Sequence, residues 1–285
     1  VRIVCLWDED YPPLLRQIHD PPALLYVRGH LPAGDGLAVV GSRRASEGGR
    51  VFTERLCREL SAAGFAIVSG LARGVDTAAH RGALNESGVT VGVLGCGIDR
   101  VYPPENKRLF QEVLERGAIV SEYPPGTEPL PGHFPARNRI ISGLCRGVAI
   151  VEAAQDSGSL ITADFALEQG REVFAVPGAV GSPNSFGPHR LLKEGAALVT
   201  EAADILDVLA PGACGGPRAA ERVDAAENLS GNTLEVYRTL EEGAVHVDEI
   251  IRRSGLTPMD VSDILLHLEL EGAVEGLPGL RYVRR

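Results

Sequence analysis

The sequence has few cysteines, few aromatic residues and no long apolar run, and each shortage excludes a class of protein. The five cysteines among 285 residues lie far apart and lack the spacing of metal ligands. This argues against a disulfide framework and indicates reduced thiols. No apolar run is long enough to cross a bilayer, and the stretch VRIVCLWDEDYPP does not have the pattern of a signal peptide. We therefore expect a cytoplasmic protein with no membrane partner.

Positive charge is also scarce. With 28 Lys and Arg against 38 Asp and Glu, the formal net charge is -10. Such a protein is not a general nucleic-acid binder, so any polyanion must be held by a local group of arginines. Hydrophobic residues make up 44% of the chain, enough for a large core and a second module.

Short apolar strands alternate with helical patterns from residue 37 to residue 210. Strands that are apolar throughout and are followed by helices predict a parallel sheet covered on both faces, a doubly wound α/β domain of the Rossmann-like kind. The expected strands are 37–41, 65–70, 89–95, 118–123, 147–153, 172–178 and 197–199, and the expected helices are 52–64, 75–88, 104–117, 159–170, 189–195 and 203–210. Asp76 is expected to cap the second helix.

Three further segments flank this domain. Residues 1–36, with two Pro-Pro pairs, are expected to form a strand-poor lead-in packed on the core. Residues 211–228 have the small, polar, Gly- and Pro-containing composition of a linker. Residues 229–285 hold three short helical patterns and a hairpin pattern, which suggests a small C-terminal winged-helix domain. Its last helix is acidic, which favours a protein-interaction module over DNA reading, although the basic tip RYVRR argues the other way.

Polar residues follow nearly every expected strand. In an open parallel sheet, ligands bind outside the carboxyl ends of the strands, where loops and helix N-termini gather backbone N–H groups. The first strand ends in Gly41, Ser42 and Arg43, a turn in which glycine lets the backbone approach an anion and the two side chains complete the coordination. An ion pair between Arg43 and a loop carboxylate is the structural alternative. Since neither GxGxxG nor a GxxxxGK lysine is present, the turn predicts a phosphate-rich ligand rather than classical NAD or ATP binding.

A second basic element, FPARNRIISGL, places Arg137, Asn138 and Arg139 at the start of a helix, whose positive end favours an anion. Residues two apart on a helix point away from each other, so both arginines are not expected to reach one ligand. Arg137 is the one expected in the site. Phe134 either stacks on a base or sugar or packs in the core.

Two later segments supply further candidates. Ser157, Gly158 and Ser159 form a turn at a helix start, which N-capping by one serine explains in part. Lys193 is a candidate for the same cleft, but it lies well inside a helix, where a solvated side chain is commoner.

Two arrangements that would suggest a metal or catalysis are incomplete. Asp76 and His80, one helical turn apart, lack a third ligand, so a helix cap and a packed histidine are expected instead of a metal site. Glu122 and Glu152 end apolar strands, but nothing nucleophilic stands beside them. The residues alone therefore predict no metal and no catalytic set.

An ordered series of motifs resembles the DNA-processing protein A family (DprA, also called Smf). The motifs are LAVVGSRRAS, IVSGLARGVDTAAHRGAL, GVLGCGIDRVYPPENKRL, SEYPPGTEP, HFPARNRIISGL, SGSLITADFALEQGREVFAVPG and LLKEGA. The resemblance implies an extended Rossmann-like domain that binds single-stranded DNA without a cofactor and without catalysis. It also implies a homodimer that protects incoming DNA and loads the RecA recombinase in natural transformation, with single-strand-binding protein as a further candidate partner.

The resemblance implies a DNA pocket as well. It places around the strand Gly41, Ser42, Arg43, Phe134, Arg137, Asn138 and Arg139, with the SGS turn and Lys193 at its margin. Some relatives have a lysine shortly before the phenylalanine, where this chain has Pro131 and Gly132. One phosphate contact is therefore expected to be lost, or to move to Arg44 or His133.

Two other functions stay open. A Rossmann-type nucleotide-processing enzyme of the phosphoribohydrolase kind should show a PGGxGT-like turn, where this chain reads DSGSLITA. A duplex-reading transcription factor would need a basic recognition helix. The aromatic content of 5% fits binding led by the DNA backbone better than a broad stacking platform. A pocket at strand ends is too narrow for a duplex, so a single strand is favoured.

Overall fold

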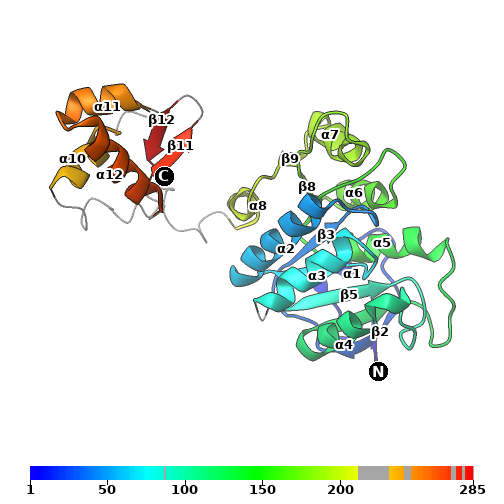
Figure 1. Ribbon diagram of the computed structural model, residues 1–285. Helices are drawn as coiled ribbons and strands as arrows, with labels where there is room; N and C mark the ends of the chain where they lie inside the picture. The colour runs from blue at the N-terminus through cyan, green and yellow to red at the C-terminus, as the bar shows by residue number, and fades with distance from the viewer. Residues whose placement is uncertain (87, 211–230, 241–244, 271–273, 278–279, 285) are drawn as a thin grey trace. The chain divides into compact units, whose positions relative to one another are not determined.

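The computed structural model describes residues 1–285 except 87, 211–230, 241–244, 271–273, 278–279 and 285. The chain forms two compact units, Val1–Cys214 and Gly215–Arg285 (Figure 1). The linker expected at 211–228 lies outside the described residues. No helix in the described part of the chain is long and apolar enough to cross a membrane.

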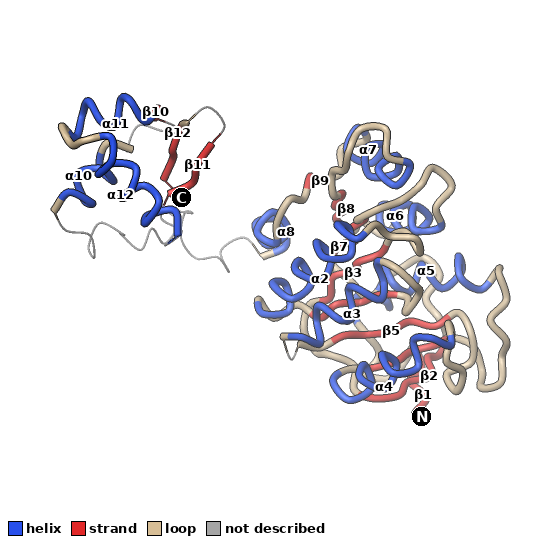
Figure 2. Tube along the Cα trace, in the orientation of Figure 1, coloured by secondary structure: helices blue, strands red, loops and turns tan. Residues whose placement is uncertain are grey.

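Unit 1 is built on a nine-stranded sheet with the order β1-β2-β6-β5-β4-β3-β7-β8-β9 (Figure 2). The strands that run parallel are β3 (Gly36–Val40), β4 (Ala66–Ser69), β5 (Thr90–Leu94), β6 (Ala118–Ser121), β7 (Gly147–Ile150), β8 (Glu172–Ala175) and β9 (Ala197–Leu198). The chain builds outward from β3 to β6, then returns to the other side of β3 and builds from β7 to β9. The strand order therefore reverses between β3 and β7, which is where such a sheet leaves a crevice for a ligand.

The lead-in contributes strands, so the expectation that it is strand-poor is wrong. β1 (Arg2–Cys5) pairs antiparallel with β2 (Leu24–Gly29), and β2 pairs antiparallel with β6. The Pro-Pro pairs that suggested irregular structure lie between these strands, and one of them opens the short helix α1 (Pro13–Arg16). The lead-in thus extends the sheet at its β6 edge.

Helices cover both faces of the sheet. One face carries α2 (Glu47–Ala62), α3 (Val75–Asn85), α4 (Lys107–Arg116, after the 3-10 turn η1 Pro104–Asn106) and α8 (Ala202–Leu209). The other carries α1, α5 (His133–Gly143), α6 (Gly158–Glu168) and α7 (Phe186–Lys193, after the 3-10 turn η2 Pro183–Ser185). The apolar strand residues are buried between the two layers, which confirms the doubly wound α/β expectation.

The start of α2 and the capping residue of α3 differ from the expectation. α2 begins at Glu47, because Ser46 is its N-cap and accepts a hydrogen bond from the Gly49 amide at 2.9 Å. Asp76 does not cap α3, whose N-cap is Gly74. Its carboxylate instead accepts hydrogen bonds from the backbone amides of Gly70 and Ala72, so it holds the preceding loop.

The described residues of unit 2 form the three helices and the hairpin expected of a winged helix. Its elements are α10 (Asn232–Arg238), β10 (Val245–His246), α11 (Val247–Ser254), α12 (Pro258–Leu270), β11 (Val274–Leu277) and β12 (Arg281–Arg284), with the sheet order β10-β12-β11. Gly255, in the left-handed region at φ 66°, turns the chain between α11 and α12. Asp260 and Asp263 are exposed on α12, as the acidic sequence of this helix suggested.

Candidate functional site

A cleft of about 860 Å³ opens where the carboxyl ends of β3 and β7 meet. Nine of the eleven residues predicted to bind the ligand line it: Gly41, Ser42, Arg43, Phe134, Arg137, Asn138, Ser157, Gly158 and Ser159. Arg139 and Lys193 do not. Arg44, expected to replace a lost phosphate contact, lies on the same wall, whereas His133 is not part of the lining.

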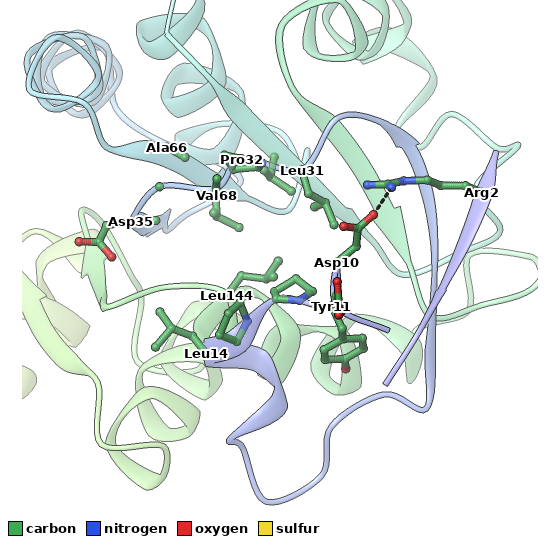
Figure 3. A pocket seen from close by; sticks show the side chains of 17 residues that line it. Arg2, Asp10, Tyr11, Leu14, Leu31, Pro32, Asp35, Ala66, Val68 and Leu144 are labelled. Atoms are coloured by element: carbon green, nitrogen blue, oxygen red, sulfur yellow. Dashed lines mark hydrogen bonds and ion pairs between the residues drawn. The ribbon is translucent and has the colours of Figure 1, made fainter. Parts of the chain in front are cut away.

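A second cavity, of about 490 Å³, lies at the opposite ends of the strands (Figure 3). It runs between the lead-in and the first residues of β3 and β4, with Leu31, Val68 and Leu144 among its apolar lining and an Arg2–Asp10 ion pair of 2.7 Å at its rim. It contains none of the predicted residues, so the sequence-based expectation concerns the first cleft alone.

The turn after β3 is fixed by backbone contacts. The Ser42 amide donates to the carbonyl of Glu152 at 2.6 Å, and the Ser42 carbonyl accepts from the Val75 amide at 3.2 Å. A Cβ on Gly41 would lie 2.8 Å from the Glu152 carbonyl oxygen, so only glycine allows β3 and β7 to approach so closely here. These contacts hold Ser42 and Arg43 at the mouth of the cleft.

Arg43 is an exposed cation with no fixed anionic partner. Its guanidinium makes no hydrogen bond or ion pair with any described residue, which excludes the loop carboxylate considered as an alternative. It lies 5.4 Å from the centroid of the Phe134 ring. Phe134 itself is partly exposed and lines the cleft rather than belonging to a core cluster. The pair therefore offers an exposed positive charge beside an aromatic ring.

Arg137 is a fixed charge in the cleft floor. Its side chain is buried, and Nη1 donates to the carbonyls of Gly70, at 3.0 Å, and Val93. Burial lowers the pKa of Arg137 to about 10, with Asp76 opposing this shift and Arg43 adding to it. The guanidinium therefore stays protonated at neutral pH. Burial raises the pKa of the Asp76 carboxyl, and Arg137 opposes that rise.

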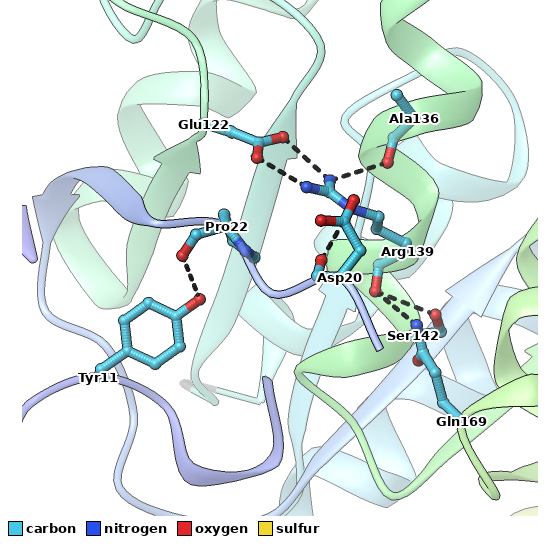
Figure 4. A network of polar contacts seen from close by, with 8 residues as sticks. All are labelled: Tyr11, Asp20, Pro22, Glu122, Ala136, Arg139, Ser142 and Gln169. Carbon is cyan, nitrogen blue, oxygen red and sulfur yellow. Dashed lines mark hydrogen bonds and ion pairs between the residues drawn. The ribbon is translucent and has the colours of Figure 1, made fainter. Parts of the chain in front are cut away.

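Arg139 does not line the cleft and instead belongs to a network of polar contacts (Figure 4). Its guanidinium binds both oxygens of Glu122, at 2.9 and 2.6 Å, and its Nε donates to Asp20 of the lead-in at 3.0 Å. The side chain is only 11% exposed. Its charge is thus committed to holding α5 against β6 and the lead-in, and of the two arginines Arg137 lines the cleft whereas Arg139 does not.

The opposite wall is formed by the start of α6. Ser157 is the N-cap, its hydroxyl lies 2.7 Å from that of Ser159, and Asn138 Nδ2 donates to the Gly158 carbonyl at 3.1 Å. The N-capping reading is therefore confirmed, and Asn138 ties α5 to this turn. Lys193, the last residue of α7, is exposed outside the cleft.

The carboxylates considered for acid-base chemistry have structural partners. Glu152 accepts hydrogen bonds from the Ser46 amide and hydroxyl, at 2.9 and 2.5 Å, and from Asn184 at 3.0 Å. Glu122 is the partner of Arg139. Both carboxylates therefore help to hold the fold together.

Asp76 and His80 have separate hydrogen-bond partners. His80 is buried, and its Nδ1 lies 2.7 Å from the Thr90 hydroxyl, which itself donates to the carbonyl of Ile67. Nδ1 therefore carries the proton and donates. Within the described ranges, no group of three or more His, Cys, Asp or Glu side chains is placed to hold a metal ion.

The family model for DNA recombination-mediator protein A matches residues 2–210, most of the chain. The chain belongs to the DNA recombination-mediator protein A family. A second family model, the DprA winged helix domain, matches residues 220–279 and agrees with the fold of unit 2. The resemblance drawn from the sequence motifs is thereby confirmed.

Relatives within the DprA family match over most of the chain. Protein Smf of Escherichia coli is 45% identical over 282 residues, which cover 97% of this chain and 75% of that protein. The X-ray structure of DprA from Streptococcus pneumoniae matches with a TM-score of 0.70 at 47% identity, covering 72% of this chain and 73% of that one. DprA from Helicobacter pylori matches with a TM-score of 0.65 at 32% identity, covering 73% and 95%. The latter structure is described for its unique single-stranded DNA binding mode.

Two residues that line the cleft of this DprA-family protein were not predicted from the sequence. Tyr102 follows β5 and Asn184 precedes α7, and both line the cleft beside predicted residues. Tyr102 had a usable signal, because it too follows the carboxyl end of a parallel strand. Asn184 had none, since its Nδ2 reaches Glu152 and the Arg44 carbonyl only once the chain is folded.

Proposed function

We propose that this DprA-family protein binds single-stranded DNA in the cleft at the β3–β7 switch point, without cofactor and without catalysis. The observation that carries the proposal is Arg43, an exposed cation held at the mouth of that cleft with an aromatic ring beside it and the fixed charge of Arg137 below it. In this proposal a phosphate of the strand is the anionic partner of Arg43, because a guanidinium can donate two parallel hydrogen bonds to phosphate oxygens. The single-strand binding described for the Helicobacter pylori relative supports the same ligand.

The positive charge of the cleft explains how a protein with a net negative charge can bind a polyanion. Arg43, Arg44 and Arg137 line the cleft, against the carboxylates Asp76 and Asp156. Asp76 is buried, and its carboxylate accepts hydrogen bonds from the backbone amides of Gly70 and Ala72, so its charge is engaged by groups of the protein itself. A few phosphates held at one such place suffice for binding, and two copies in a homodimer strengthen it through effective concentration.

The biological role we propose follows from family membership. The protein protects incoming single strands and loads the RecA recombinase during natural transformation, as a homodimer in the cytoplasm, with single-strand-binding protein as a further partner. A direct check is RecA filament formation on single strands coated with single-strand-binding protein: this chain should shorten the lag, and an unchanged lag would remove the loading role.

The first experiment is binding of a labelled oligo-dT and of the matching duplex, followed by fluorescence anisotropy at several salt concentrations with free nucleotides as competitors. We expect salt-sensitive preference for the single strand. Binding of free nucleotides with turnover, and no binding of the strand, would instead support the phosphoribohydrolase-like enzyme.

Arg43→Ala tests the cleft itself. Removing one phosphate contact should weaken single-strand binding and lower the salt slope by roughly 0.7 to 1. Arg58→Ala is the matched control, because Arg58 is an exposed arginine of α2 that does not line the cleft. Equal effects of the two substitutions would mean that the turn after β3 is not part of the site.

A further inference from the structure

We propose that Tyr102 is a second base-stacking residue of the cleft, so that two nucleobases are held, one on Tyr102 and one on Phe134. The inference rests on the proposed single-strand binding and adds to it the group that receives the second base. Tyr102 comes from the loop after β5 and Phe134 from the first turn of α5, and the fold brings both into the lining of one cleft.

The geometry of the two rings favours two bases rather than one. Their centroids are 5.5 Å apart and their planes are inclined by 34°. A planar base that stacks flat on one ring is inclined to the other ring, so one base cannot stack on both rings. Each ring can therefore stack with a base of its own. Arg43 lies over Phe134, where it can hold the phosphate of a nucleotide whose base stacks nearby.

Tyr102 is exposed but is carried by an anchored loop. Its side chain is 37% exposed, while the next residue, Pro103, is buried. Asn106 Nδ2 donates to the Leu71 carbonyl at 2.9 Å and to the Thr77 hydroxyl at 3.0 Å, which ties the loop to the segment after β4. An aromatic side chain on a fixed backbone loses little conformational entropy when a base stacks on it.

A neighbouring aromatic pair shows what a structural pair looks like at this edge of the sheet. Tyr123 and His133 stack with centroids 4.1 Å apart, and His133 Nδ1 lies 3.2 Å from the Gly95 carbonyl. Neither ring lines the cleft. Tyr102, by contrast, lines it, and its hydroxyl makes no hydrogen bond to any described residue.

The low aromatic content of the chain is compatible with this arrangement. An aromatic share of 5% argues against a broad stacking surface, but two rings at one place are enough for two bases. Contacts to the phosphates of the DNA would still supply most of the salt-dependent affinity.

The test compares oligo-dT with an abasic oligonucleotide of the same length, which keeps the phosphates and lacks the bases. Wild-type protein should bind oligo-dT more tightly, and Tyr102→Leu should weaken that binding about fivefold or more while leaving abasic binding unchanged. Tyr102→Phe keeps the ring and should bind like the wild type. Trp7→Leu is the matched control, because Trp7 is an aromatic residue of the lead-in, 82% exposed and outside the cleft.

A double-mutant cycle distinguishes a Tyr102 ring that stacks on its own base from a Tyr102 ring that only supports the position of Phe134. If each ring holds its own base, Tyr102→Leu weakens oligo-dT binding by the same factor in the wild type and in Phe134→Leu. No further loss in the Phe134→Leu background would overturn the proposal, as would an equal loss on the abasic strand, an equal loss in Tyr102→Phe, or no loss at all. Failure of wild-type protein to bind either strand would instead refute the proposed function.

Discussion

Replacing Arg139 by methionine should destabilise unit 1 without removing a phosphate contact. The substitution keeps a long, unbranched side chain in the same space and deletes the guanidinium. It therefore asks whether this arginine, one of the predicted DNA-binding residues, acts through the strand or through the fold.

The size of the effect follows from the burial of the partners. Arg139 is 11% exposed and binds both oxygens of Glu122, which is 28% exposed. Removing one member of a buried pair costs about 3–5 kcal/mol because the other charge is left without a partner. Glu122 keeps some contact with water, so we expect the lower end, about 3 kcal/mol. The Asp20 contact adds little, since Asp20 is 78% exposed.

The assay has two readouts, urea unfolding followed by far-UV circular dichroism and strand binding over a range of salt concentrations. We expect a lower unfolding midpoint and an unchanged salt slope, even where affinity falls because α5 is less well held. Arg139→Lys should be intermediate in stability, because an ammonium cannot bind both carboxylate oxygens as a fork does. Wild-type stability together with a salt slope lowered as in Arg43→Ala would refute the reasoning.

Three further substitutions have defined outcomes. Gly74→Ala should lower stability by about 1–3 kcal/mol and weaken strand binding, because Gly74 has φ 73° and its Cβ would lie 2.2 Å from the Ser42 carbonyl oxygen; normal thermal stability and affinity would contradict this. Burial lowers the pKa of His80 from 6.5 to about 3. The neutral imidazole therefore contributes stability to the fold above pH 6.5, and this contribution is lost as the pH falls from 6.5 to 3, by up to about 1.4 kcal/mol per pH unit. Because glutamine does not titrate, His80→Gln should reduce this loss of stability on acidification. Urea midpoints measured across this range should therefore vary less with pH than in the wild type. Lys193→Ala should leave both affinity and salt slope within error of the wild type in the anisotropy assay, because Lys193 lies outside the cleft; a slope lowered by about one would place it on the strand.

The parallel core was predictable because its strands are buried on both faces and therefore read as unbroken apolar runs. β1 and β2 were missed for the opposite reason: only Val4 of β1 is buried, and the neighbouring proline pairs suggested irregular structure. The start of α2 was placed too late because Gly48 and Gly49 occupy its first turn, where glycine weakens a helical pattern.

The cleft was largely predictable for a topological reason. Carboxyl ends of parallel strands meet at one edge, so polar residues that follow each strand gather there without any knowledge of distances. The partners of those residues were not predictable in the same way. Asp20 meets Arg139 across 119 positions of sequence, and Tyr102 meets Phe134 only because the loop after β5 folds toward α5. Neither pairing leaves a periodic trace in the sequence.

The packing of the lead-in limits where the protein can be truncated. The hydroxyl of Tyr11 donates to the Pro22 carbonyl, and Tyr11, Leu15 and Leu25 are fully buried in the core of unit 1. A fragment that starts at residue 37, where the first parallel strand was expected, would expose this core, bare the edge of β6 and leave the Arg139–Glu122 pair open to solvent. A fragment suited to binding studies therefore retains the lead-in together with the parallel sheet and its helices through α8.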